Sequence, residues 1–226
     1  NRGHGSRTAN PPNYRVNFRS DDEWKGLVSL NLNIVRVPSQ HFGSVIARKS
    51  GAVGGSTYAT QVRVNNGTRI TYAAVETIDQ RFADNHFPTD PDGNLYRALR
   101  DQNPNFDYRG TNPASYMSTF FKLNNVSEND WSDLIGMLNV MGDNNTIPFT
   151  TENVRQVVNV EQWMRHLAVM NLLGNSESGL NSSANDDYSM YAGEIDPRFQ
   201  LIYWDLDQIL GQNSFGPTSG IFSMDG

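Results

Sequence analysis

The hydrophobic pattern of this chain predicts five short strands. In each segment apolar and polar residues alternate, or β-branched and aromatic residues cluster between turn formers. The segments are residues 13–18, 60–64, 71–75, 188–191 and 199–204. Asn65-Asn66-Gly67 separates the second segment from the third and is typical of a hairpin turn. The fifth segment leads into Asp205 and Asp207, so we expect these acids to lie at a strand exit.

Apolar residues recur at helical spacing in three other segments, which predicts three helices. The segments are residues 39–49, 127–138 and 160–173. Ser39 is the expected cap of the first helix, and Asn159 that of the third. The third pattern is the clearest, because Trp163 and Met170 belong to one apolar stripe and Gly174 ends it.

The segment from residue 78 to about residue 110 is rich in Asp, Asn and Pro. We expect a long irregular surface connection there, with a short helical piece near residues 95–100. Residues 1–80 should supply strands and one helix, and the remainder should be mainly helical with one hairpin. These elements predict an α+β fold, and 226 residues suffice for one large core or two lobes that share a cleft.

Charge and composition exclude several classes of function. A net charge of −6 and a pI near 5.1 do not favour a surface that binds polymeric nucleic acid. The chain has no Cys, and its four His residues lack metal-ligand spacing, so a zinc site is not expected. No segment resembles a signal peptide or a membrane span. The chain opens without Met, and we expect it to be part of a longer polypeptide, truncated at its ends.

Acidic side chains follow the third predicted helix in three places. Glu177 comes just after the helix, Asp187 directly precedes a predicted strand, and Asp205 follows the next strand. Phosphoryl transfer requires a group that orients or deprotonates the attacking hydroxyl, and hard oxygen ligands for the magnesium that bridges the phosphates. Protein kinases place such groups in this order along the chain, so the order indicates a phosphoryl-transfer site.

Motifs in the second half of the chain resemble those of the CotH kinase-like family, which is named after a bacterial spore-coat protein. The helical segment that ends in Leu172-Leu173-Gly174-Asn175 resembles the family's helix before a G-N-x-D motif. Asp187-Tyr188-Ser189-Met190-Tyr191 resembles its N-Y-x-L-Y strand. Trp204-Asp205-Leu206-Asp207-Gln208 resembles its W-D-L-D segment.

The first third of the chain carries the same resemblance. Arg2-Gly3-His4-Gly5-Ser6-Arg7 resembles the family's R-G-N-S-S-R stretch, and residues 14–18 resemble its y-k-l-k-F strand. Residues 75–79 resemble its v-E-x-i-D connection between lobes. One such motif would be weak evidence, but all of them occur in the family's order.

The resemblance implies a single CotH-like domain over residues 1–226 with a divergent, two-lobed protein-kinase-like fold. It implies a strand-rich first lobe to about residue 80 and a mainly helical second lobe from about residue 81. The implied activity is the transfer of phosphate from ATP, with Mg²⁺ or Mn²⁺, to proteins at the bacterial cell or spore surface. The implied location is secreted or at the cell surface.

The resemblance also implies roles for the acidic residues. Asp205 would be a catalytic, metal-binding acid that positions the phosphates, and Asp187 stands where the family has a metal-binding Asn. Asp207 would be a further metal ligand. Glu177 stands where the family has the catalytic Asp, and it is longer by one methylene.

Three residues are the implied contacts of the nucleotide. Arg2 belongs to the first motif, Arg15 to the first strand, and Glu76 to the connection beside the base. Kinase folds usually hold the α- and β-phosphates with a strand lysine, but this chain has no lysine in residues 14–18. Arg15 would then provide the cation, since arginine binds phosphate through two N–H groups.

Two other functions fit the same residues. A pseudokinase-like binding module of a coat or extracellular matrix would retain the fold without transfer, which the missing lysine and Glu177 favour. A glycoside hydrolase would use Glu177 and Asp205 as its paired carboxylates.

Overall fold

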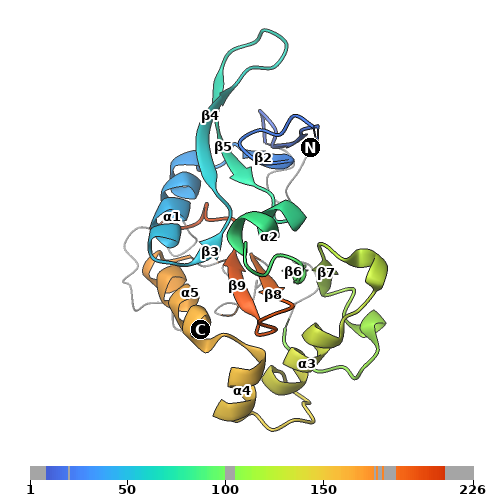
Figure 1. Cartoon of the computed structure of the whole chain (residues 1–226). Helices are drawn as coiled ribbons and strands as arrows, with labels where there is room; N and C mark the ends of the chain where they lie inside the picture. Colours follow the sequence, from blue (N-terminus) through green and yellow to red (C-terminus); the bar gives the residue numbers. More distant parts are fainter. Residues whose placement is uncertain are drawn as a thin grey trace.

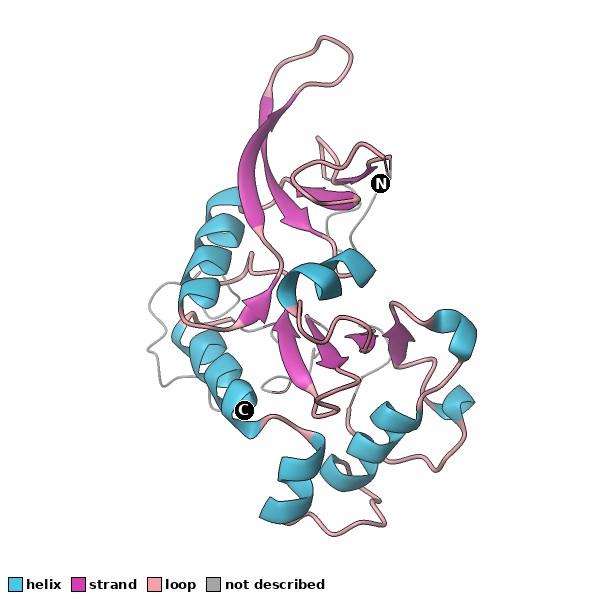
Figure 2. Cartoon of the chain, in the orientation of Figure 1, coloured by secondary structure: helices cyan, strands magenta, loops and turns pink. Residues whose placement is uncertain are grey.

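The computed structural model describes residues 9–19, 21–99, 105–175, 177, 180 and 187–211. Within them the chain has an α+β fold with two β-sheets, and helices pack beside both (Figures 1 and 2). The helices are α1 (Val37–Lys49), α2 (Gln80–His86), α3 (Ser132–Met141), α4 (Thr151–Val157) and α5 (Val160–Leu172), with 3-10 turns at Pro113–Ser115 and Val126–Glu128.

The first sheet has four antiparallel strands in the order β1-β2-β5-β4. They are β1 (Tyr14–Asn17), β2 (Ser29–Asn33), β4 (Thr57–Val62) and β5 (Ile70–Glu76). The β4–β5 hairpin extends beyond the rest of the molecule (Figure 1).

The two faces of this sheet differ in polarity. One face carries a small apolar cluster around Leu30, Leu32 and Tyr72. On the other face, Arg15 of β1 pairs with Asn31 of β2, which pairs with Val75 of β5, which pairs with Thr57 of β4. Directly opposed residues lie on the same side of a sheet, so these four side chains form one row.

The second sheet has five strands in the order β3-β9-β8-β6-β7. They are β3 (Val53–Gly54), β6 (Asn94–Ala98), β7 (Phe120–Lys122), β8 (Tyr188–Ala192) and β9 (Gln200–Tyr203). Strand β3 follows α1 in the chain and pairs in parallel with β9. The first third of the chain therefore contributes an edge strand to the sheet of the last third.

Helix α5 is attached to β9 by hydrogen bonds as well as by apolar packing. The side-chain amide of Gln162 donates to the carbonyl of Leu201 at 2.7 Å and accepts from its N–H at 2.8 Å. The indole N–H of Trp163 donates to the carbonyl of Phe199 at 2.8 Å. These bonds hold β9, and with it the segment that carries Asp205, in one position.

Several sequence-based predictions are confirmed. Helix α5 begins after Asn159, whose side chain accepts from the N–H of Gln162, as predicted. The predicted strands correspond to β1, β4, β5, β8 and β9, and two of the predicted helices to α1 and α5. Helix α3 begins at Ser132, five residues after the predicted start, because a 3-10 turn at Val126–Glu128 precedes it.

Other predictions are wrong. Residues 94–98 form β6, an inner strand of the second sheet, not a surface helix, and Leu95 and Tyr96 are fully buried. Ser39 does not cap α1, because the helix already begins at Val37 after the left-handed Arg36. The part after residue 80 contains four strands beside its helices, more than the single hairpin expected. No helix of the described segments is long and apolar enough to cross a membrane.

Candidate functional site

A cavity of about 200 Å³ lies between the two sheets. Its wall combines residues from both sheets and from the connection that joins β5 to α2. They are Arg15, Asn31, Thr77, Ile78, Asp79, Arg97, Phe121, Leu123 and Trp204. Two arginines and an aspartate therefore share the cavity with two aromatic rings, which is a suitable lining for a flat, polar ligand with a negative charge.

Arg15 lies in the wall of this cavity. Its Nη2 donates to the hydroxyl of Ser29 at 3.3 Å, and that hydroxyl donates to Asp79 Oδ2 at 3.2 Å. Burial raises the pKa of Asp79, although the N–H of Phe82, the Ser29 hydroxyl and the charge of Arg15 act in the opposite direction.

Glu76 is buried and its carboxylate is fully engaged by the protein. Its Oε2 accepts from the N–H of Ser56 and from the ring of His86, both at 2.9 Å, and its Oε1 accepts from Asn85 at 3.4 Å. Burial alone would raise the pKa of Glu76, but these donors outweigh it and lower the pKa. Glu76 thus fixes the start of the connection, while the residues after it line the cavity.

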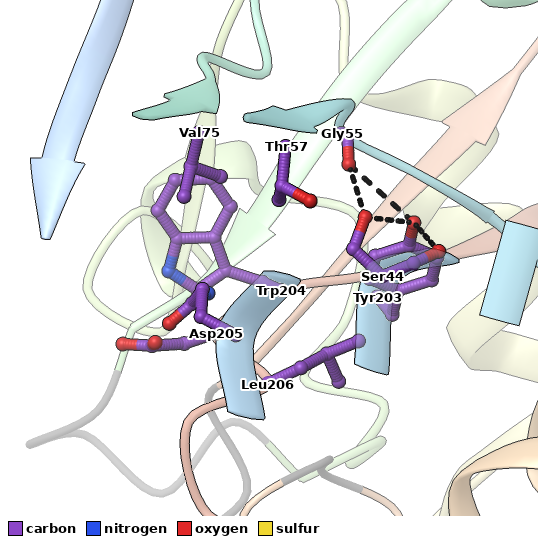
Figure 3. A pocket seen from close by; sticks show the side chains of 9 residues that line it. Ser44, Gly55, Thr57, Val75, Tyr203, Trp204, Asp205 and Leu206 are labelled. Carbon is purple, nitrogen blue, oxygen red and sulfur yellow. Dashed lines mark hydrogen bonds between the residues drawn. The ribbon is translucent and has the colours of Figure 1, made fainter. Parts of the chain in front are cut away.

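Asp205 follows Trp204, the first residue after β9, and lines a small cavity near the end of this strand (Figure 3). The N–H of Trp204 donates to the carbonyl of Asp187 at 3.2 Å, so Asp187 and Asp205 lie at the same end of the β8–β9 pair. The backbone of Asp205 is in the left-handed region, with φ of 46°. Such a conformation is uncommon for a residue other than glycine and is found mostly in turns and at functional positions.

A buried polar contact joins helix α1 to Tyr203, the last residue of β9. The hydroxyl of Ser44 donates to the carbonyl of Gly55 at 2.9 Å and lies 3.0 Å from the hydroxyl of Tyr203 (Figure 3). Gln40, one turn earlier in α1, lines a small cavity of about 10 Å³ together with Asp205. Contacts with α1 and with α5 therefore both fix the position of the end of β9.

The acidic residues around Asp205 influence one another. The pKa of Asp207 is raised to about 7, first by burial and then by the negative charges of Asp205 and Glu177, while Arg36 acts in the opposite direction. Mutual repulsion of this kind favours a bound cation. However, no group of three carboxylate or imidazole side chains with a metal-binding arrangement occurs within the described part of the chain.

The remaining predicted site residues are only partly placed. The N–H of Glu177 donates to the side-chain oxygen of Asn175 at 3.1 Å, in the loop after α5. The negative charge of Glu177 helps to raise the pKa of Asp207, so Glu177 belongs to the same acidic region. Arg2 lies outside the described residues.

Sequence analysis missed four residues that line the two cavities. They are Asn31, Gln40, Thr77 and Arg97. Arg97 is a lone cation in the apolar run of β6, which could have identified it, but the run was predicted as a helix. Asn31 reaches the larger cavity only through the pairing of distant strands, and Gln40 lies in α1, so neither segment shows its place in a cavity wall by its own pattern. Thr77 lies within the motif of residues 75–79, but no role was predicted for it.

A family model described as CotH kinase protein matches residues 1–221, nearly the whole chain. The search of curated proteins found no match.

Proposed function

The chain belongs to the CotH kinase protein family, and on this premise we propose that it is an ATP- and divalent-metal-dependent phosphotransferase with a two-lobed, kinase-like fold. The first sheet with α1 would be one lobe, and the second sheet with α3 to α5 would be the other. The single observation that carries the proposal is the cavity between the sheets. Trp204 lines both this cavity and the smaller one that Asp205 lines.

The nucleotide would bind in this cavity. Trp204 and Phe121 offer aromatic surface to a base, and aromatic rings stack on bases of any identity. Arg15 and Arg97 would bind the phosphates, and Arg2 would add a third cation. This arrangement would replace the lysine of other kinases by guanidinium groups, which bind phosphate with two parallel N–H donors.

Asp205, Asp187 and Asp207 would hold the Mg²⁺ or Mn²⁺ ion, since carboxylates are the hard oxygen ligands that these ions prefer. The ion, when bound, would neutralise phosphate charge during transfer. The raised pKa of Asp207 supports this assignment, because the repulsion that raises it would be relieved by a cation. Glu177 would orient or deprotonate the hydroxyl of the acceptor.

The acceptor would be a protein at the cell or spore surface, and the chain would then be secreted or displayed there. Family membership supports a protein acceptor. The location is proposed from the resemblance of the motifs alone.

The test is incubation with labelled ATP and Mg²⁺ or Mn²⁺, followed by mass spectrometry for phosphate on the protein and on surface-protein extracts. Metal-dependent labelling that is lost in Asp205→Asn is expected. Metal-dependent ATP binding without any transfer would instead favour the second candidate, a pseudokinase-like module of coat or matrix assembly. The longer acid at Glu177 is the observation that favours this candidate.

A further inference from the structure

Asn31 is the most unusual polar residue in the wall of the cavity between the sheets. Its side chain is 1% exposed, and neither its Nδ2 nor its Oδ1 has a hydrogen-bond partner within the described chain. Buried polar groups are almost always paired, and an unpaired one lowers the stability of the folded state. A carboxamide that is kept at such a position indicates a partner that binds from outside the chain.

The strand register places this carboxamide at the cavity. Asn31 pairs with Arg15 on one side and with Val75 on the other, and Arg15 and Asn31 both line the cavity. Thr77, two residues beyond Val75, lines it as well, and its hydroxyl is also buried without a partner in the described residues. The backbone N–H groups of Thr77 and Ile78 likewise form no hydrogen bond with any described residue.

We propose that Asn31 and Thr77 bind the nucleoside part of the nucleotide and not its phosphates. The inference rests on the proposed function and deepens it. A carboxamide places an NH2 group, which donates, beside a carbonyl oxygen, which accepts, and a hydroxyl can do both. Phosphate oxygens only accept, so a phosphate would leave Asn31 Oδ1 unpaired. A base edge or a ribose carries donors next to acceptors and satisfies both atoms. The two arginines of the cavity remain for the phosphates.

Loss of the Asn31 carboxamide should have opposite effects on the stability of the ligand-free protein and on its affinity for a nucleoside. Asn31→Leu is similar in size and removes the unpaired amide, so the melting temperature of the ligand-free protein should stay equal or rise. The same change should weaken adenosine binding by about tenfold or more, because the lost hydrogen bonds lie in a desolvated site. Thr77→Val should have a smaller effect of the same sign.

The experiment is calorimetric titration of the whole chain with three probes: adenosine, Mg·ATP and Mg·tripolyphosphate. Asn33→Leu is the matched control, since Asn33 belongs to the same strand and the same face but does not line the cavity. We expect Asn31→Leu to weaken adenosine and Mg·ATP equally and to leave tripolyphosphate unchanged.

Three outcomes would overturn the proposal. Equal adenosine affinity in the wild type and Asn31→Leu would remove Asn31 from the site. A selective loss of tripolyphosphate binding would make Asn31 a phosphate ligand. A lower melting temperature of ligand-free Asn31→Leu, with unchanged affinities, would show a structural role. A failure of the proposed function gives a different result. If the wild type binds adenosine but transfers no phosphate, the phosphotransferase proposal fails and the role of Asn31 and Thr77 stands. If the wild type binds no nucleotide at all, both proposals fail.

Discussion

The guanidinium of Arg97 lies over the indole ring of Trp204, with its central carbon 4.8 Å from the ring centroid. It forms no hydrogen bond or ion pair with the residues that the structure describes. Trp204 directly precedes Asp205, so this contact places a permanent cation, with its N–H donors available, beside the proposed metal site.

Replacement of Arg97 by Leu should lower the affinity for Mg·ATP by about tenfold, because charge-assisted hydrogen bonds to phosphate would be lost. The affinity for adenosine should change less. Arg97→Lys should restore part of the loss, since it keeps the charge without the paired donors. Isothermal titration measures both ligands, and Arg69→Leu in the exposed β4–β5 loop is the control. Unchanged Mg·ATP affinity in Arg97→Leu would exclude a role in phosphate binding.

Replacement of Asp205 by Asn should abolish the magnesium-dependent part of the ATP-induced rise in melting temperature. The change keeps the shape of the side chain and removes the charge that would bind the cation. A ligand that binds only the folded state must raise the melting temperature, so the shift reports binding directly. The exposed Asp21→Asn variant should behave as the wild type. Equal, non-zero shifts in wild type and Asp205→Asn would show that Asp205 does not hold the metal.

In the metal-free protein, the contribution of Asp207 to stability should fall as the pH rises from about 4 to about 7. The pKa of Asp207 is raised to about 7 in the folded state, so the folded chain holds a proton in this window that the unfolded chain has released. Asp207→Asn should remove this decline, and at pH 8 it should be more stable than the wild type by roughly 2 kcal/mol, a value reduced for the partial exposure of the side chain. Denaturant titrations in the presence of a chelator measure the difference. Parallel curves for the two proteins would refute the raised pKa of Asp207 in the folded state.

On the acid side, His166 should destabilise the protein. The side chain is 1% exposed in α5, and burial lowers its pKa to about 4. The unfolded chain therefore takes up this proton first as the pH falls below about 6.5, and the folded state loses roughly 3 kcal/mol by pH 4. His166→Leu should lose less stability than the wild type over this range. If both proteins lose the same amount, the acid sensitivity arises elsewhere.

The local elements of the fold could be predicted because their patterns are complete within a few residues. Helix α5 has its cap at Asn159 and its apolar stripe within one continuous segment, and the prediction was accurate at both ends. Strand β2 alternates polar and apolar residues over Ser29–Asn33, so its pattern was present but was overlooked. Strand β6 was mistaken for a helix because its partners, β7 and β8, lie about 20 to 90 residues further along the chain and do not show in its own pattern.

The candidate site could be predicted only where it follows directly from the chain order. The place of Asp205 at a strand exit follows from the apolar run before it. The facing residues do not follow in this way, because Asn31 and Arg97 reach the same cavity only after two separate sheets have formed. Glu76 illustrates the converse: its position in the connection was predicted, but its three hydrogen-bond donors come from Ser56 and from α2.

The parallel pairing of β3 with β9 means that the two proposed lobes are not independent folding units. Gly54 of β3 lies against the ring of Tyr203 so closely that a Cβ atom there would approach the ring within 2.3 Å, so the joint admits no side chain. A cut after residue 80 would leave the C-terminal fragment with an unpaired sheet edge at β9 and the N-terminal fragment with an orphaned strand. Chain dissection would therefore yield aggregation-prone halves, whereas the intact chain should unfold in one cooperative transition.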